Sequence, residues 1–334
     1  EVVNSAWERA ATLYESANRA QNLKIGAASL LALRGNQEAL TYLQRLAESN
    51  DFQLQFDAAT ALYLAGQSIP SGLLRAGFES GRLDIRARAA ELAGLVGDQA
   101  SDEFLATMFS DRSSELSAPA AIAYARLGKR AVVPDLVTML TGVNETKGEA
   151  ALRALVILGG DDVVEQLRMQ INLTEGQRQF RVLRALHELG DANASKRIAE
   201  ALEKDPVAAP EAARILAAKG DWAASQFLRE RLERREDPTE QNELNRVNNA
   251  SALIMGGDSA ATVVLQNMLS SEFPSVKILV CNKIAILQRS NLLTLLRPGI
   301  ENVSPAVAFN ACVAAISYAE LEYRDRLFRV WNVQ

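Results

Sequence analysis

Apolar runs that end in glycine recur along this chain at a nearly constant spacing. The intervals between successive glycines of this kind are 31, 31, 31, 31, 31, 30 and 36 residues. The glycines that define these intervals are Gly35, Gly66, Gly97, Gly128, Gly159, Gly190, Gly220 and Gly256. Two further apolar runs continue the series without glycine and place Gln288 and Ala319 at the corresponding positions. A period of this length is the signature of a repeat protein, and the series predicts about ten repeats.

Each period carries the pattern of two helices. In the third period, the segment Leu83–Val96 has one apolar helical face, formed by Ile85, Ala89, Leu92 and Val96. Gly97 is placed to end this helix with a positive φ, and Asp98 to cap the next helical segment. A second helix is predicted over Ser101–Phe109, with Phe104, Leu105 and Met108 as its apolar residues. The same stop-and-restart signal recurs, because aspartate also comes after glycine at Asp161, Asp191, Asp221 and Asp258.

A two-helix unit of this size cannot bury both of its apolar faces alone, whereas stacked units can. The sequence therefore predicts an all-α superhelix of about ten helix pairs, with residues 1–334 forming a single solenoid. Its end units must hide the last apolar faces, so we expect a capping repeat over residues 1–35 and a capping helix over residues 320–334. The apolar residues of these caps are Trp7, Leu13, Tyr14, Tyr323, Leu327, Val330 and Trp331.

The longest interval contains a charge-dense segment, residues 227–248, around Asp237 and Pro238. The extra length predicts a longer first helix and a protruding loop. Charged runs usually face water, so we interpret this segment as a solvated insertion, with a partner contact as the alternative.

Residues 85–97, with the sequence IRARAAELAGLVG, resemble the second helix of the short HEAT repeats of bacterial HEAT-like proteins, which include phycobilin lyase subunits. The resemblance implies a HEAT-like superhelix and a mode of binding, but no particular reaction. The other repeats match the pattern loosely. At the position of Arg86, two repeats keep a basic residue and three do not, the residues there being Lys24, Lys277, Gln55, Ser117 and Gly148.

Composition narrows the function classes. The formal net charge of -5 and the pI of about 5.3 argue against the basic footprint of a nucleic-acid-binding protein. Some DNA glycosylases have HEAT-like folds, but they frame a catalytic acid with tryptophans in a basic cleft, and the three tryptophans here are scattered along the chain. We therefore expect no nucleic acid among the partners.

The apolar runs are too short for a transmembrane segment, because none reaches 18 residues. The chain begins at Glu1 rather than at a methionine, which is consistent with a removed leader or an excised piece of a longer protein. We expect a cytoplasmic protein, with an exported or envelope-anchored protein as the alternative.

Catalytic side chains are sparse. His187 is the single histidine, and no serine lies in a nucleophile-elbow motif. The pair His187-Glu188 is similar to the metal-binding pairs of deoxyhypusine hydroxylase, but that enzyme uses several such pairs. We interpret His187 as a helix-end residue, favoured near the negative end of the helix dipole. The sequence predicts no catalytic residue, no metal and no cofactor, and hence a protein that is not an enzyme.

Cys281 and Cys312 occupy the same register in adjacent repeats, where earlier repeats carry alanine. Two cysteines do not make a disulfide framework. Cysteine packs well as a small apolar side chain, so we interpret both as core residues, with a redox or metal role as the alternative.

One register could face a partner, because second helices line the concave side of HEAT solenoids. Six residues before the terminal glycine, successive repeats carry Glu91, Ile122, Arg153, Arg184 and Arg214, and Arg181 lies three residues before Arg184. Guanidinium groups suit carboxylates and phosphates. We expect Arg153, Arg181, Arg184 and Arg214 to grip an acidic segment of a partner. The alternative is a solvated stripe that pairs with neighbouring acids such as Glu149 and Glu188.

The sequence thus predicts a bacterial scaffold or adaptor that binds another protein on its concave surface. The alternative is a subunit that holds a chromophore or a small anionic ligand, as the resemblance to phycobilin lyase subunits implies.

Overall fold

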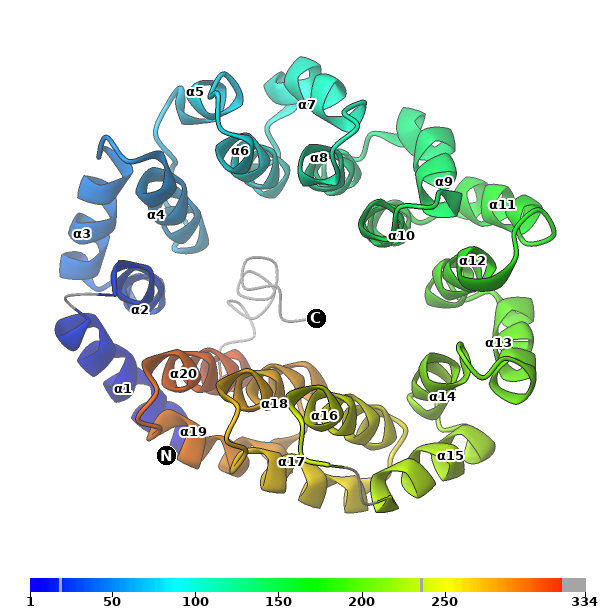
Figure 1. Ribbon diagram of the computed structural model, residues 1–334. Coiled ribbons are helices and arrows are strands. Elements are labelled where there is room, and N and C mark those ends of the chain that lie inside the picture. The colour runs from blue at the N-terminus through cyan, green and yellow to red at the C-terminus, as the bar shows by residue number, and fades with distance from the viewer. Residues whose placement is uncertain (18–19, 235–236, 320–334) are drawn as a thin grey trace. The chain divides into compact units, whose positions relative to one another are not determined.

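The computed structural model describes residues 1–17, 20–234 and 237–319 (Figure 1). In this part of the chain there are twenty α-helices, α1 to α20, and no strand. The helices succeed one another as ten pairs, with four short 3-10 segments, η1 to η4, between them. The predicted all-α helix-pair architecture is therefore confirmed.

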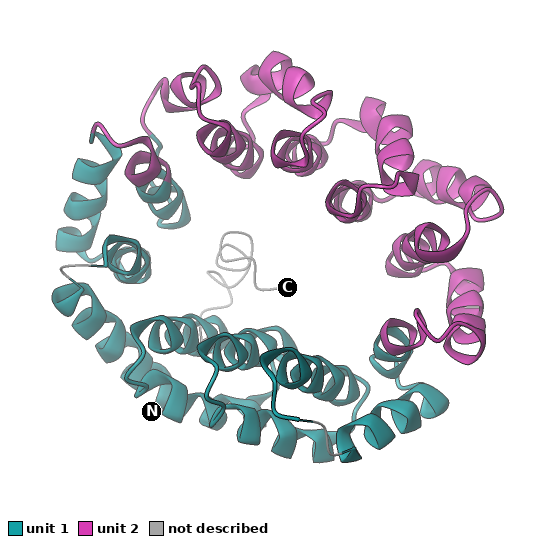
Figure 2. Cartoon of the chain, in the orientation of Figure 1, with its two compact units in different colours: residues 1–49, 57–69, 213–334 teal, residues 50–56, 70–212 magenta. Residues whose placement is uncertain are grey.

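The chain divides into two compact units (Figure 2). Unit 1 comprises residues 1–49, 57–69 and 213–334, and unit 2 comprises residues 50–56 and 70–212. Unit 1 holds α1 Val2–Ser16, α2 Gln21–Leu33, α3 Gln37–Ala47, α15 Trp222–Glu233, α16 Glu240–Met255, η3 Ser259–Ala261, α17 Thr262–Met268, α18 Pro274–Leu287, η4 Ser290–Leu296, α19 Arg297–Ile300 and α20 Pro305–Ala319. Unit 2 holds α5 Leu73–Phe78, α6 Leu83–Val96, η1 Gln99–Ser101, α7 Asp102–Phe109, α8 Ser114–Arg126, η2 Arg130–Val132, α9 Val133–Thr141, α10 Glu145–Leu158, α11 Asp161–Gln170, α12 Gly176–Glu188 and α13 Ala192–Lys204. Two helices contribute residues to both units, α4 Phe52–Leu64 and α14 Ala209–Ala217.

The repeated glycines end the second helix of each pair. Seven of them have a positive φ: Gly35, Gly66, Gly97, Gly128, Gly159, Gly190 and Gly220. A residue without a Cβ adopts this left-handed conformation at little cost, which explains the periodic glycine. In the eighth repeat, Gly257 has the positive φ (105°), not the predicted Gly256. Gln288 has a φ of 48° and is the one non-glycine residue with positive φ in the described chain, so its predicted register is confirmed.

The aspartates after these glycines cap the next helix. The Asp98 carboxylate accepts a hydrogen bond from the Ala100 backbone N–H, and Asp221 accepts one from Ala224. Such caps satisfy backbone donors that the first turn leaves unpaired. The exception is Asp161, because Gly160 lies at the N-cap of α11 and Asp161 is the first helical residue.

Unit 1 brings the beginning of the chain against its later repeats. Helix α1 packs on α19 and α20, and α2 also contacts α20. Arg297 forms an ion pair with Glu1 at 2.8 Å, and Arg9 donates to the Asn302 carbonyl. Residues 1–35, for which we expect a capping repeat, thus contact α20 through both of their helices. The predicted capping helix, residues 320–334, lies outside the described residues.

In unit 2 the helices form two layers (Figure 2). The second helices α6, α8, α10 and α12 lie side by side on the inner side of a curved stack, with α5, α7, α9, α11 and α13 outside them. Small residues allow close approach within a layer. A Cβ on Gly94 of α6 would lie 2.7 Å from the Ala123 Cα of α8. Helices α6 and α8 thus approach each other through glycine and alanine.

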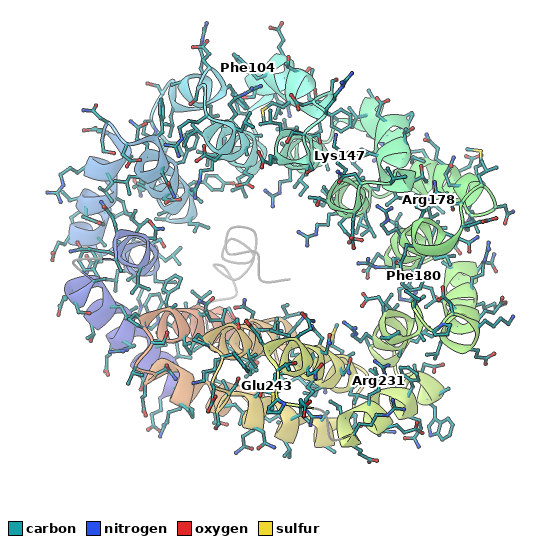
Figure 3. The ribbon with its side chains drawn as sticks, viewed as in Figure 1. Phe104, Lys147, Arg178, Phe180, Arg231 and Glu243 are labelled. Atoms are coloured by element: carbon teal, nitrogen blue, oxygen red, sulfur yellow. The ribbon has the colours of Figure 1, made fainter. Side chains whose placement is uncertain are left out.

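The charge-dense segment differs from the prediction of a longer first helix. Helix α15 has 12 residues, one fewer than α13, whereas the second helix α16 has 16. Its charged side chains also make contacts within unit 1. Arg231 lies over the Phe227 ring at 5.2 Å, and Glu243 accepts a hydrogen bond from the Ser271 hydroxyl (Figure 3 labels Arg231 and Glu243).

Across the described chain, no helix has both the length and the apolar character needed to cross a membrane.

Candidate protein-interaction surface

The predicted register places four residues on the inner layer of unit 2. Glu91 of α6 and Arg153 of α10 are exposed, and Ile122 of α8 and Arg184 of α12 are half-buried. Arg214 lies on α14 in unit 1. The surface described here therefore consists of residues of unit 2 alone. We call it the inner surface, defined by Glu91, Ile122, Arg153, Ile157 and Arg184.

Arg184 is held between acidic residues of neighbouring repeats. Its Nη1 lies 2.9 Å from Oε1 of Glu149 on α10, and its Nε lies 4.0 Å from Oε1 of Glu211 on α14. Part of each side chain remains exposed, so the ion pair is worth no more than about 1 kcal/mol. Arg184 thus pairs with Glu149, one of the two acids named in the alternative interpretation.

Arg153 has a different environment. Within the described chain, its exposed side chain makes no ion pair or side-chain hydrogen bond. Ile157 lies one turn later on α10 and is 48% exposed. Residues four apart share a helix face, so α10 presents a cation and an aliphatic side chain together. Sequence reasoning missed Ile157, although its spacing of four residues from Arg153 was the available signal.

Arg181 does not join the exposed arginines. It is 7% exposed, and its Nη2 donates to the Gly142 carbonyl at 2.8 Å. The guanidinium occupies the space beside Gly148, where a Cβ would lie 1.3 Å from Nη1. The prediction that Arg181 contacts a partner is therefore wrong, because its side chain packs against the preceding repeat.

Lys147 acts in the same way one repeat earlier. Its Nζ donates to the Asp111 carbonyl, which lies between the two helices of the preceding repeat, at 2.8 Å. Figure 3 labels Lys147 on α10, and Arg178 and Phe180 on α12. Basic residues near the start of these second helices thus tie one repeat to the linker of the repeat before it.

Arg130 of unit 2 connects its own repeat to the end of the next one. Arg130 donates to the carbonyls of Leu158 and Gly159, at 3.0 and 2.6 Å, and forms an ion pair with Asp162. Its cation satisfies carbonyls that the end of α10 leaves unpaired. The side-chain hydrogen bond from Arg130 keeps the pKa of the Asp162 carboxyl below its usual range. The role of Arg130 is therefore structural. Of the two arginines of the inner surface, Arg184 forms an ion pair and Arg153 does not within the described residues.

Glu91 gives the α6 end of the inner surface a different character. Desolvation raises the pKa of its carboxyl, although part of the side chain is exposed, and the nearby cations Arg88 and Arg126 lower it. From α6 to α12 the register therefore changes from acidic to aliphatic to basic. A partner with acidic residues would meet its complement at the α10–α12 end.

The other candidate chemical groups have structural environments. His187 lies in the last turn of α12, as predicted, and its Nδ1 lies 2.9 Å from the Ser195 hydroxyl. Cys281 and Cys312 are free and buried. Burial raises the pKa of both thiols to about 12, so they are protonated at neutral pH.

No protein-family model matches this chain, and no curated protein matches it in sequence. Among solved structures, the chain is similar to the complex of CpcE and CpcF of phycocyanin lyase from Nostoc sp. PCC7120. The identity is 18%, the match covers 80% of this chain and 94% of that chain, and the TM-score is 0.41. Human deoxyhypusine hydroxylase in complex with glycerol is 18% identical over 87% of this chain and 98% of that chain, with a TM-score of 0.36. An engineered protein is 17% identical over 95% of this chain and 99% of that chain, with a TM-score of 0.33. All three scores are below 0.5, so the fold assignment rests on the helix pairs themselves.

These comparisons correct one prediction. We expected a protein that is not an enzyme, but the similar structures include a lyase and a hydroxylase. The expectation that the chain is not an enzyme, which we drew from its sparse catalytic side chains, is therefore corrected. The phycocyanin lyase structure agrees in part with the resemblance to phycobilin lyase subunits, whereas membership of a bacterial HEAT-repeat family has no family match behind it.

Proposed function

We propose that the chain is a protein-interaction scaffold that binds a partner on the inner surface of unit 2. The observation that carries the proposal is the joint exposure of Arg153 and Ile157 on one face of α10. Neither side chain is needed to pack α10, because its core contacts come from the buried Ala151, Ala154 and Leu155.

The chemistry of these two side chains favours a protein segment over a small anion. The centres of protein interfaces combine apolar area with arginine. Arg153 would meet a carboxylate of the partner, and Ile157 and Ile122 would meet an aliphatic side chain beside it. The contacts of Arg184 with Glu149 and Glu211 orient its guanidinium, which keeps further N–H donors for a second carboxylate. The proposed partner is therefore a segment that carries both acidic and aliphatic residues.

Affinity capture from a lysate of the native source organism tests this proposal. The bait is the full chain, compared with Arg153→Glu and with Ile157→Asp. Two exposed residues of the outer layer supply matched controls, Lys196→Glu for the charge and Met169→Ala for the apolar side chain. Quantitative mass spectrometry should find proteins that both controls retain and both inner-surface variants lose.

Two results would count against the proposal. Equal capture by all five baits would place the binding surface elsewhere. A small molecule that co-purifies with the wild type, and is lost in Arg153→Glu while no protein is lost, would favour the ligand-holding subunit. Circular dichroism of each bait confirms that the variants retain their helices.

A further inference from the structure

A second surface, in unit 1, exposes a tryptophan. Trp222 is 73% exposed at the start of α15, whereas Trp7 is 5% exposed in the core of the same unit. The helix does not need this side chain to begin, because Asp221 supplies the N-cap. Tryptophan is among the residues that most often dominate binding energy at interfaces, so the exposed Trp222 ring is a candidate contact for a partner.

The neighbouring repeat places an exposed methionine beside this corner. Gly220 and Gly256 lie in contact, since a Cβ on Gly220 would lie 3.5 Å from the Gly256 carbonyl oxygen. A Cβ on Gly256 would lie 1.9 Å from the Ala217 carbonyl oxygen. Met255, directly before Gly256, is 51% exposed. The turn before α15 and the end of α16 therefore lie in contact, and the exposed Trp222 and Met255 are close to this contact along the chain.

Cations flank these side chains. Nη2 of Arg289 donates to the Met255 carbonyl at 3.2 Å, and Lys219 lies directly before Gly220. Both side chains are exposed, and neither forms an ion pair within the described residues.

The acids near this edge are already engaged. Asp221 accepts the capping hydrogen bond from the Ala224 backbone N–H, and Asp258 forms an ion pair with Arg229 at 2.8 Å. Within the described part of unit 1, the edge is therefore an apolar pair with two cations that lack acidic partners.

We propose that Lys219, Trp222, Met255 and Arg289 form a docking edge for a linear protein segment that carries an aromatic or aliphatic side chain next to acidic residues. Trp222 and Met255 contact the apolar side chain, and Lys219 and Arg289 contact the carboxylates. Methionine adapts its shape to an incoming apolar group, and the charge complement selects an acidic segment over a basic one. The docking edge lies in unit 1 and is independent of the inner surface proposed for unit 2.

Selection from a displayed library of random short linear peptides, on the immobilised full chain, tests the docking edge. The enriched peptides should combine an aromatic or large aliphatic residue with Asp or Glu. A labelled enriched peptide, titrated by fluorescence polarisation, should bind Trp222→Ala about thirtyfold more weakly than wild type. Lys219→Glu should also weaken binding, and the difference from wild type should shrink at high salt. Met169→Ala and Lys196→Glu in unit 2 should bind as wild type does.

Several results would overturn the proposal. They are a failure to enrich any peptide, enrichment of peptides without acidic residues, and equal binding to Trp222→Ala and wild type. A second copy of the chain could occupy the docking edge instead of a peptide, and light scattering tests this. If the wild type forms an oligomer and Trp222→Ala does not, a second copy occupies the edge and the proposal is overturned. Arg153→Glu should leave the peptide affinity unchanged, so failure of this proposal and failure of the inner surface can be told apart.

Discussion

A Cβ atom on Gly148 would lie 1.3 Å from Nη1 of Arg181. Gly148 therefore makes room for a guanidinium that comes from the next repeat and donates to the Gly142 carbonyl. The position of Gly148 is the one at which other repeats carry Lys24, Arg86 or Lys277. A basic side chain is absent there because another one, from α12, fills the adjacent space.

We predict that Gly148→Ala destabilises the protein, although replacing glycine by alanine inside a helix normally stabilises it by about 0.5–1 kcal/mol. The methyl group must displace the buried guanidinium, and overpacking of this kind costs about 1–3 kcal/mol. Urea unfolding followed by circular dichroism measures the effect. The double variant Gly148→Ala/Arg181→Ala should lose less than the sum of the single variants, because the clash is gone. A Gly148→Ala variant that is more stable than wild type would contradict the account.

The ion pair of Arg184 with Glu149 should contribute weakly to stability. Both side chains are partly exposed, so a double-mutant cycle with alanine at each position should give a coupling of about 0.2–1 kcal/mol. The coupling should decline between low and high salt because the charges are screened. A coupling well above this range would mean that Arg184 is structural and not available to a partner.

Gln288 occupies a conformation that costs an L-residue about 1–2 kcal/mol. Its Nε2 donates to the Ser317 hydroxyl at 3.2 Å, which offsets part of this cost. We expect Gln288→Gly to raise the free energy of unfolding by up to about 1 kcal/mol. The reciprocal variant Gly128→Gln, at an open site with a φ of 70°, should lower it by about 1 kcal/mol. Thermal melts of both variants give the comparison, and effects of the same sign would contradict the assignment of Gln288 to the glycine register.

The buried thiols should make the fold sensitive to alkali. Burial raises the pKa of Cys281 and Cys312 to about 12, against an ordinary value near 9.0. The folded state thus keeps a proton that the unfolded state releases, and this contribution is present below pH 9 and is lost as the pH rises toward 12. Cys281→Ala/Cys312→Ala should lose less stability over this range than wild type. Equal losses, measured by urea midpoints at each pH, would contradict burial as the cause.

The sequence was sufficient for features that depend on local backbone geometry. The segment Leu83–Val96 was predicted as a helix and is α6, and Asp98 caps the turn after it as expected. Of the predicted glycines, only Gly256 lacks the positive φ, which its neighbour Gly257 adopts instead. Periodicity carries this information because a helix stop needs one particular conformation at one residue.

Features that depend on contacts between repeats could not be read from the sequence. Arg181 lies three residues from Arg184, yet one is buried against α10 and the other is partly exposed. The difference depends on how α12 is rotated against its neighbour, which periodicity does not specify. In the same way, no local signal announces that α1 packs on α20.

Site-specific photocrosslinking tests the inner surface most directly. Benzoylphenylalanine would replace Ile157 on the inner surface in one variant. In a control variant it would replace Met169 in the outer layer of the same unit. Both variants would be expressed in the native source organism. We expect irradiation to give a discrete crosslinked protein from position 157, absent from position 169 and lost when Arg153→Glu is added. Crosslinks of the same protein from both positions, or from position 169 alone, would contradict the proposal that a partner binds the inner surface.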